Sequence, residues 1–458
     1  MSSLNASLAT ALSGLSAEQG ALAATTNNVA NANTPGYSRE VPVLVSSDPI
    51  VVDPLTLGTG VTLQSIESIR DPILESSIQQ ESQTQGQLNA QVAALQQTQT
   101  NFVTSTSDIG TEITNFFNNI NQLATSPSDL SVRQGVLTAA DNLATSFNTT
   151  ANSLSQQQTS LDQSVVETVG QINQLTGQIA QLNGQVSDLE NAGENAGSFV
   201  DQRQQAIDQL SSLVDVSVIP SNNTLTLTTA NGTPLVLGQQ SFNLQTQLNA
   251  DGLHDVYAQG VDITSSITSG QLGGTLQVRD QQIPALQTQL DTLATGLANS
   301  VNGVQTAGYD LNGELGTNFF NPPPASGTGA AASLSVAITD PSLIAASSDG
   351  TSGSNGNAEA MYALNTQPVI AGQTPTDYYS GVVFNVGNDV SNATAEQTAS
   401  SQVLAQLNDQ RASVSGVSLD EEAANMVQYQ NAYAASAQVI TAINNMMYDV
   451  IQMTTLTG

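Results

Sequence analysis

The single histidine has the clearest capacity for chemistry. His254 lies in the run Asp251-Gly252-Leu253-His254-Asp255, and a histidine next to a carboxylate can act as a general base for a serine. Such serines usually occupy a Gly-x-Ser-x-Gly turn between a strand and a helix, and no such turn accompanies His254. We therefore interpret His254 as a solvated turn histidine and predict no catalytic residue.

A second candidate is the run from Asp310 to Glu314, whose oxygen-bearing side chains alternate as calcium ligands do. An EF-hand loop has glycine at its sixth position and glutamate at its twelfth, where this chain has Leu315 and Asn321. We interpret the run as a turn. No metal site is predicted.

Composition excludes further classes of site. The six basic side chains are all arginines, and 38 acidic ones give a formal charge of −32. Without lysine there is no phosphate-binding loop or Schiff base, and without cysteine no disulfide, thiol nucleophile or cysteine-ligated zinc. Scattered arginines in so acidic a chain argue against nucleic acid and anionic membranes as partners. No cofactor is expected, and the glycosylation sequons at Asn148 and Asn231 carry little weight.

Targeting signals of the usual kinds are not recognisable. Residues 1–20 lack the basic and apolar regions of a cleaved secretory signal, and no stretch reaches membrane-spanning length without polar interruption. We expect no membrane insertion, and any export should use a route without such a signal.

Most of the chain carries apolar residues at alternating three- and four-residue steps, which predicts helices with narrow apolar stripes. Such stripes are typical of coiled coils and elongated bundles. Within the helical body we expect separate helices near 130–148, 154–189 and 199–214. The predicted parts are an N-terminal assembly helix at 1–40, an extended connector at 41–70, a helical body at 71–214 and 283–414 with a flexible loop at 322–357, and a C-terminal assembly helix at 415–458.

The period changes to two after Val214, where Val214, Val216 and Val218 alternate with polar residues. Asn231-Gly232, between two such runs, is a strong hairpin signal. We therefore predict a small β-domain at 215–282. The predicted fold class is mainly α with an inserted β-domain, and with the terminal helices paired as a coiled coil.

The start of the C-terminal helix explains three consecutive carboxylates that could be mistaken for catalytic ones. Ser418 and Glu421 match the first and last positions of a capping box. Asp420, Glu421 and Glu422 fall in the first turn, where the helix dipole favours negative charge. Helix capping therefore accounts for them without catalysis.

Both ends of this acidic chain are almost uncharged. Residues 1–38 contain one charged side chain, Glu18, and residues 423–458 contain one, Asp449. A helix in water normally keeps a charged face, so we expect the two ends to cover each other and to pack against neighbouring copies. They should be mobile in the isolated chain and become ordered on assembly. The predicted assembly interface comprises Leu4, Leu8, Leu15, Leu22, Val29, Met426, Tyr433, Ile440, Met447 and Ile451.

Two motifs stand out near the ends of the chain. The first motif includes Asn31, Asn33, Thr34, Pro35, Gly36 and Tyr37, and the second includes Leu419, Asp420, Glu421 and Glu422. They closely resemble the N- and C-terminal signatures of the flagellar rod, hook and hook-associated proteins. The helical middle and the segment from Asn302 to Phe320 favour the hook-associated members.

The resemblance implies a structural subunit of the hook–filament junction, located outside the cell and exported by the flagellar type III apparatus. Its implied partners are further copies in a homo-oligomeric ring, the hook protein, the third hook-associated protein and an export chaperone that binds the C-terminal helix. Two alternatives stay open. One is the hook protein, whose middle should be mainly β, or another axial subunit; the other is an exported coiled-coil adhesin, which should carry a signal or an anchor.

Overall fold

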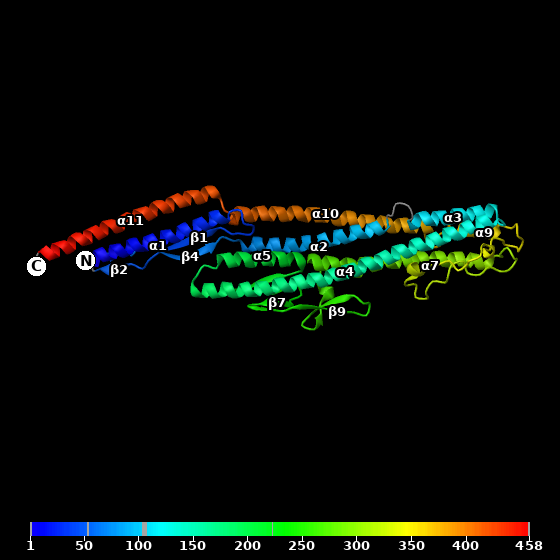
Figure 1. Cartoon of the computed structure of the whole chain (residues 1–458), viewed down its shortest axis with the longest axis horizontal. Helices are drawn as coiled ribbons and strands as arrows, with labels where there is room; N and C mark the ends of the chain where they lie inside the picture. The colour runs from blue at the N-terminus through cyan, green and yellow to red at the C-terminus, as the bar shows by residue number, and fades with distance from the viewer. Residues whose placement is uncertain (1, 53–54, 103–107, 222, 457–458) are drawn as a thin grey trace.

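The computed structural model describes residues 2–52, 55–102, 108–221 and 223–456. It is elongated, with a body of long helices, a small β-insert on one side and a pair of terminal helices that extends beyond one end of the body (Figure 1). The predicted fold class, mainly α with an inserted β-domain, is confirmed. Within the described ranges, no helix is both long and apolar enough to span a membrane.

The body is built around α4, a helix of 63 residues from Leu130 to Ala192. Its N-cap Asp129 accepts the amide of Ser131 at 2.7 Å, and Gly193 ends it in a left-handed conformation. The expectation of separate helices at 130–148 and 154–189 was wrong, because no glycine or proline lies between residues 136 and 169 to end the first one. The other body helices are α2 (Pro72–Phe102), α3 (Ile109–Thr125), α5 (Gly197–Leu213), α6 (Gly270–Gln277), α7 (Ile283–Ala307), α8 (Ala330–Ser333), α9 (Gly356–Ala363) and α10 (Pro375–Ser415).

The end of the body remote from the termini holds a core of aromatic side chains. Phe116, Phe117, Phe319 and Phe320 are buried, with neighbouring ring centroids 5.0 to 5.8 Å apart. Asn302 fixes this core, because its Oδ1 accepts the amides of both Phe319 and Phe320 at 2.8 Å. The segment from Asn302 to Phe320 noted in the sequence is therefore a packing unit.

The loop at 322–357 is tied to this core, so the expected flexible loop was wrong. Its Leu334, Ile338 and Ile344 are buried. The buried guanidinium of Arg133 on α4 donates to the carbonyls of Pro341 and Ile344, at 3.1 and 2.7 Å. The loop lacks helical or strand periodicity, and its order comes from these long-range contacts.

The insert contains two antiparallel sheets, in the orders β5-β6-β7-β8 and β11-β10-β9. The predicted hairpin at Asn231-Gly232 joins β6 to β7, and Gly232 has a φ of 86°. The predicted end of the insert was wrong, because residues 270–282 are helical. Gly274 on α6 faces the backbone of Gln87 so closely that a side chain would clash, and α6 therefore packs on α2. The strands are β5 (Ser217–Ser221), β6 (Thr224–Thr228), β7 (Pro234–Leu237), β8 (Gln240–Ser241), β9 (Leu244–Leu248), β10 (His254–Ala258) and β11 (Val261–Asp262).

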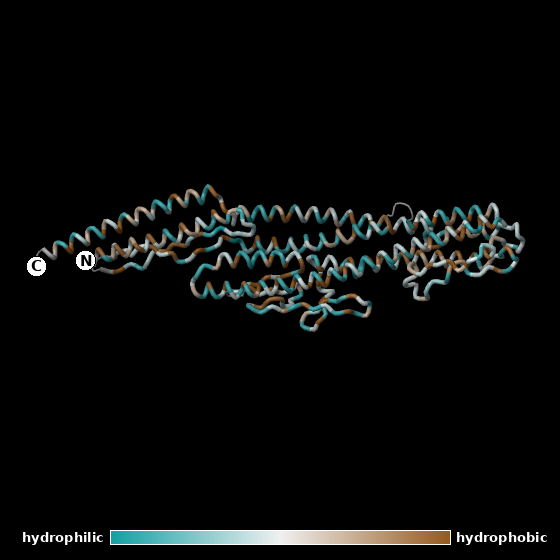
Figure 2. Tube along the Cα trace, in the orientation of Figure 1, coloured by the Kyte–Doolittle hydropathy of each residue, from teal (hydrophilic) through white to brown (hydrophobic). Residues whose placement is uncertain are grey.

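The terminal part consists of two long helices and a β-ribbon. Helix α1 (Ser2–Asn31) packs on α11 (Leu419–Leu456) and on the ribbon of β1 (Glu40–Ser46) and β4 (Val61–Ser68), so the expected extended connector is this ribbon. A short hairpin of β2 (Ile50–Val52) and β3 (Leu55–Leu57) extends it. The two chain ends lie at the same end of the molecule (Figure 1), and Figure 2 shows hydrophobic residues recurring along both helices.

Candidate functional site: the terminal helix pair

Helices α1 and α11, here called the terminal helix pair, run antiparallel. Asn28 on α1 lies next to Glu422 near the start of α11, and Gly14 lies next to Ser436 further along it. The buried apolar side chains among the described residues of α1 are all small: Ala11, Ala17, Ala21 and Ala24. Small side chains allow close approach, so α1 packs closely between α11 and the ribbon. The leucines predicted for the interface, Leu4, Leu8, Leu15 and Leu22, are half-buried, and Val29 is exposed.

The buried face of α11 follows a heptad repeat. Met426, Tyr433, Ile440 and Met447 lie half-buried on this face. The sequence analysis missed Ile443, which is only 4% exposed and continues the alternating three- and four-residue steps from Ile440 to Met447. Ile451 lies outside this repeat and is 54% exposed. Whether these residues meet neighbouring copies stays a prediction.

The outer face of α11 exposes large apolar side chains. Val427, Val439, Met446 and Tyr448 are 48 to 62% exposed, and Leu12 on α1 is also exposed. Exposed apolar side chains that gather on one element often mark a site of contact with another protein. Because the terminal helix pair extends beyond the body, the body does not cover this face (Figure 1).

The N-terminal motif forms the turn that ends α1. The Asn31 side chain donates to Asn27 Oδ1 at 2.9 Å and accepts from the Thr34 hydroxyl at 3.2 Å. Gly36 has a φ of 79°, a conformation that favours glycine. Asn33 and Pro35 are exposed. The motif thus directs the chain back along α1 into β1.

Asn28 connects this turn to both terminal helices. Its Oδ1 accepts the Tyr37 hydroxyl and the Glu40 amide, both at 2.8 Å. Its Nδ2 donates to the Glu40 carbonyl at 2.8 Å and to Glu422 Oε2 at 3.1 Å. Burial raises the pKa of Tyr37, and the nearby Glu40 charge raises it further, so the phenol stays a donor. The sequence analysis left Asn28 out of the predicted site, because its role depends on Glu422, which is 394 residues away.

The predicted capping box is only half formed. The Ser418 hydroxyl accepts the Glu421 amide at 3.5 Å, but the Glu421 carboxylate pairs with Arg39 Nη1 at 2.7 Å instead of returning to Ser418. A guanidinium is a stronger partner than a neutral amide. Glu422 is buried and lies 3.0 Å from Arg39 Nε, whereas Asp420 and Leu419 stay exposed. The motif therefore fixes α11 to the residues that follow α1.

A network of polar contacts joins the terminal helix pair to the body. We call it the joint and define it as residues 37–40, 69–75, 195–208 and 411–422. The amide of Ser38 donates to Asp201 at 3.2 Å, and Arg70 pairs with the same carboxylate. Asn195 donates to Glu40 at 3.0 Å. Four of the six arginines, Arg39, Arg70, Arg203 and Arg411, lie in this joint.

The structure corrects the interpretation of His254. It lies on β10, and its Nδ1 is 2.6 Å from Asp162 Oδ2 on α4. The buried Arg279 donates to Asp162 Oδ1 and to the His254 carbonyl, both at 2.7 Å. Burial favours the neutral carboxyl of Asp162, but the hydrogen bonds from His254, together with the positive charges beside it, outweigh burial and lower the pKa of Asp162. His254 therefore attaches the insert to α4. The sequence could not reveal this, because Asp162 lies 92 residues away.

Other candidate groups are engaged in local structure. The turn at 310–314 is confirmed, since Asp310 Oδ1 accepts the amides of Asn312 and Glu314 at 2.8 and 3.0 Å. Across the described ranges, no group of three or more His, Asp or Glu side chains is arranged to hold a metal ion.

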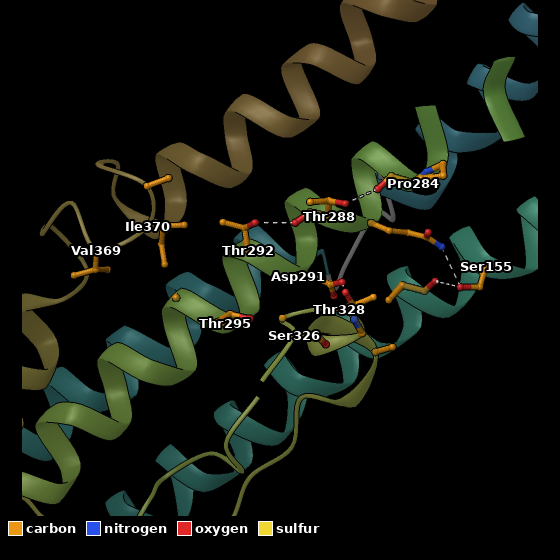
Figure 3. Close-up of a pocket in the computed structure, with 17 residues that line it drawn as sticks. Ser155, Pro284, Thr288, Asp291, Thr292, Thr295, Ser326, Thr328, Val369 and Ile370 are labelled. Carbon is orange, nitrogen blue, oxygen red and sulfur yellow. Dashed lines mark hydrogen bonds between the residues drawn. The ribbon is translucent and has the colours of Figure 1, made fainter. Parts of the chain in front are cut away.

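The groove in Figure 3, of about 690 Å³, lies between α4, α7 and residues 326–329. The hydroxyls of Thr288 and Thr292 donate to helix carbonyls, and Asp291 accepts the amides of Gly329 and Ala331. These groups stabilise the groove walls.

Comparisons with known proteins agree along the whole chain. Residues 95–320 match the family model of the flagellar hook-associated protein FlgK helical domain. Residues 8–37 match that of the flagella basal body rod protein, and residues 409–453 that of the C-terminal region of the flagellar basal body rod FlgEFG proteins.

The similarity to individual relatives extends over nearly the whole of each chain. Flagellar hook-associated protein 1 of Bacillus subtilis is 30% identical, over 98% of each chain. Its namesake in Escherichia coli is 26% identical over 95% of this chain and 97% of that one. The solved structure of the hook junction protein FlgK from Burkholderia pseudomallei shares the fold, with a TM-score of 0.67 and 19% identity. It covers 74% of this chain and 100% of its own.

Proposed function

The chain belongs to the flagellar hook-associated protein 1 family, and from this premise we propose how it assembles as an exported, extracellular structural subunit at the hook–filament junction. In this proposal the terminal helix pair is the assembly unit, and copies of the chain pack their pairs side by side in a ring. The body and the insert face outward. The family is one of structural proteins, and we assign no catalytic activity to the chain.

The observation that carries the proposal is the exposed apolar face of α11. Its Val427, Val439, Met446 and Tyr448 are open to water, and Asp449 is the only charged side chain between residues 423 and 458. Burying apolar surface contributes about 25 cal/mol per Å², so neighbouring pairs gain free energy by covering this face. The unit contains the predicted assembly interface, which comprises Leu4, Leu8, Leu15, Leu22, Val29, Met426, Tyr433, Ile440, Met447 and Ile451.

The same face supports the proposed partners. Before export, the apolar side chains that α11 exposes would need to be shielded from water, and a cytoplasmic export chaperone that binds α11 would do this. In the flagellum, the hook protein on one side and the third hook-associated protein on the other would continue the packing of terminal helices. All six arginines already have partners within this chain, so copies of it have no unpaired arginine to offer one another.

Charge makes this assembly sensitive to salt and acid. Copies that each carry −32 repel one another when packed into a ring. Because the Debye length falls from about 10 Å at 0.1 M salt to about 3 Å at 1 M, added salt screens this repulsion. Polymerisation of the purified chain, followed by light scattering, should therefore increase with ionic strength and as the pH falls toward 5. A yield that responds to neither would contradict the proposed packing.

A further inference from the structure

Glu75 is an unusual residue in the joint. It lies in the first turn of α2, is 8% exposed, and its Oε2 has no hydrogen-bond partner among the described residues. Its other oxygen, Oε1, is 4.0 Å from Arg70 Nη1, at the outer limit of an ion pair. A buried carboxylate with an unpaired oxygen is costly when charged, and protonation removes that cost.

The charges around Glu75 do not balance when it is ionised. Asp201 and Asp208 face it from α5, Arg411 faces it from α10, and Arg70 precedes α2. Arg70 pairs with Asp201, and Arg411 pairs with Asp208 at 3.2 Å. These two pairs are neutral in themselves. An ionised Glu75 therefore adds one uncompensated negative charge.

One of these residues, Asp201, also contacts the segment that joins the terminal helix pair to the body. Asp201 accepts the amide of Ser38, and the amide of Arg39 donates to the Ser415 carbonyl at 2.8 Å. A cavity of about 330 Å³ lies between the two parts, lined among others by Pro35, Glu75 and Asp208. A change in charge at Glu75 thus acts where the two parts meet.

We propose that Glu75 is a proton-operated switch that sets how firmly the terminal helix pair is held to the body. When Glu75 is ionised, its unpaired charge weakens the joint. When it is protonated, the two arginine–carboxylate pairs are balanced and the joint closes. This inference concerns the isolated chain and does not depend on the ring.

The direction of the pH effect follows from the surroundings. Burial raises the pKa of Glu75 above its ordinary value of 4.5, and the charge of Asp208 raises it further, against Arg70 and Arg411. Burial also raises the pKa of Asp201 and of Asp208. A carboxyl whose pKa is raised by folding stabilises the folded joint at low pH, and this stability is lost as the pH rises through the raised pKa. The joint should therefore tighten as the pH falls from neutral toward 4.5.

Hydrogen exchange in the full-length monomer tests the switch. The amides of Ser38 and Glu40, which bond across the joint and to Asn28, report its opening. Between pH 7.5 and pH 5, their protection relative to unstructured peptides should rise in the unmodified chain, because folding raises the pKa of Glu75. Glu75→Gln should already show higher protection at pH 7.5 and should keep only the part of the pH response that Asp201 and Asp208 contribute.

The matched control is Glu67→Gln on β4, an exposed glutamate of the ribbon, which should keep the response of the unmodified chain. Asp208→Asn removes the charge that raises the pKa of Glu75, so it should move the response to lower pH even if Glu75→Gln folds poorly. A Glu75→Gln chain that keeps the full pH response would overturn the proposal. So would an Asp208→Asn chain whose response is unshifted.

Discussion

Cells whose only copy of this chain lacks residues 419–458 are expected to build hooks without filaments and to lose swimming motility completely. The deletion removes α11, which exposes the face of α1 that contains Gly14 and Asn28, and it leaves Arg39 without Glu421 and Glu422. Electron microscopy of sheared flagella and swimming in soft agar measure the two effects. Filaments of normal length and number on such cells would contradict the assignment of α11 as an assembly element.

Failure of export must be separated from failure of assembly. If a chaperone binds α11, the truncated chain would stay in the cytoplasm and motility would be lost for that reason. Adding purified truncated chain and purified full-length chain to isolated hooks removes the export step. Only the full-length chain should bind. Equal binding of the two chains would limit the role of α11 to export.

Glu422→Ala is expected to destabilise the terminal helix pair by about 2 kcal/mol, which is about thirtyfold in its opening equilibrium. Glu422 is 1% exposed, and its carboxylate contacts Arg39 and the side chain of Asn28. Removing it leaves the Asn28 amide without this acceptor, while Arg39 keeps Glu421, and this limits the loss. Amide exchange of α1 and α11 in the monomer measures the effect.

The matched control is Asp420→Ala. Asp420 lies in the same turn but is exposed, and its contribution through the helix dipole is typically 0.3–1 kcal/mol. We therefore expect exchange to increase by less than about tenfold in this control. If the two substitutions had the same effect, the buried contacts of Glu422 would have no special role.

The elements that depend on local pattern were predictable from the sequence. The heptad spacing of α11, the proline and glycine that follow α1, and the Asn231-Gly232 hairpin are each specified by neighbouring residues. The two almost uncharged ends could also be recognised as helices that must pack against other helices. These features alone gave the fold class and the outline of the site.

Features that depend on long-range contacts were not predictable in this way. Asp162 gives His254 its structural role, and Glu422 does the same for Asn28, from 92 and 394 residues away. The loop at 322–357 has the composition of a flexible segment, yet Arg133 and buried apolar side chains hold it. The predicted capping box forms only in part for a similar reason. Arg39, which is distant in the sequence, pairs with the Glu421 carboxylate.

Substitution of Val439 by aspartate tests most directly whether neighbouring copies cover the outer face of α11. Val439 is 48% exposed, so the monomer of Val439→Asp should keep the helicity and amide protection of the unmodified chain. Ile443→Asp, at a buried position on the same helix, should lose both. At a salt concentration where the unmodified chain polymerises, we expect Val439→Asp to stay monomeric in sedimentation and its cells to lack filaments. Polymerisation and filaments at unmodified levels would show that this face is not an interface between copies.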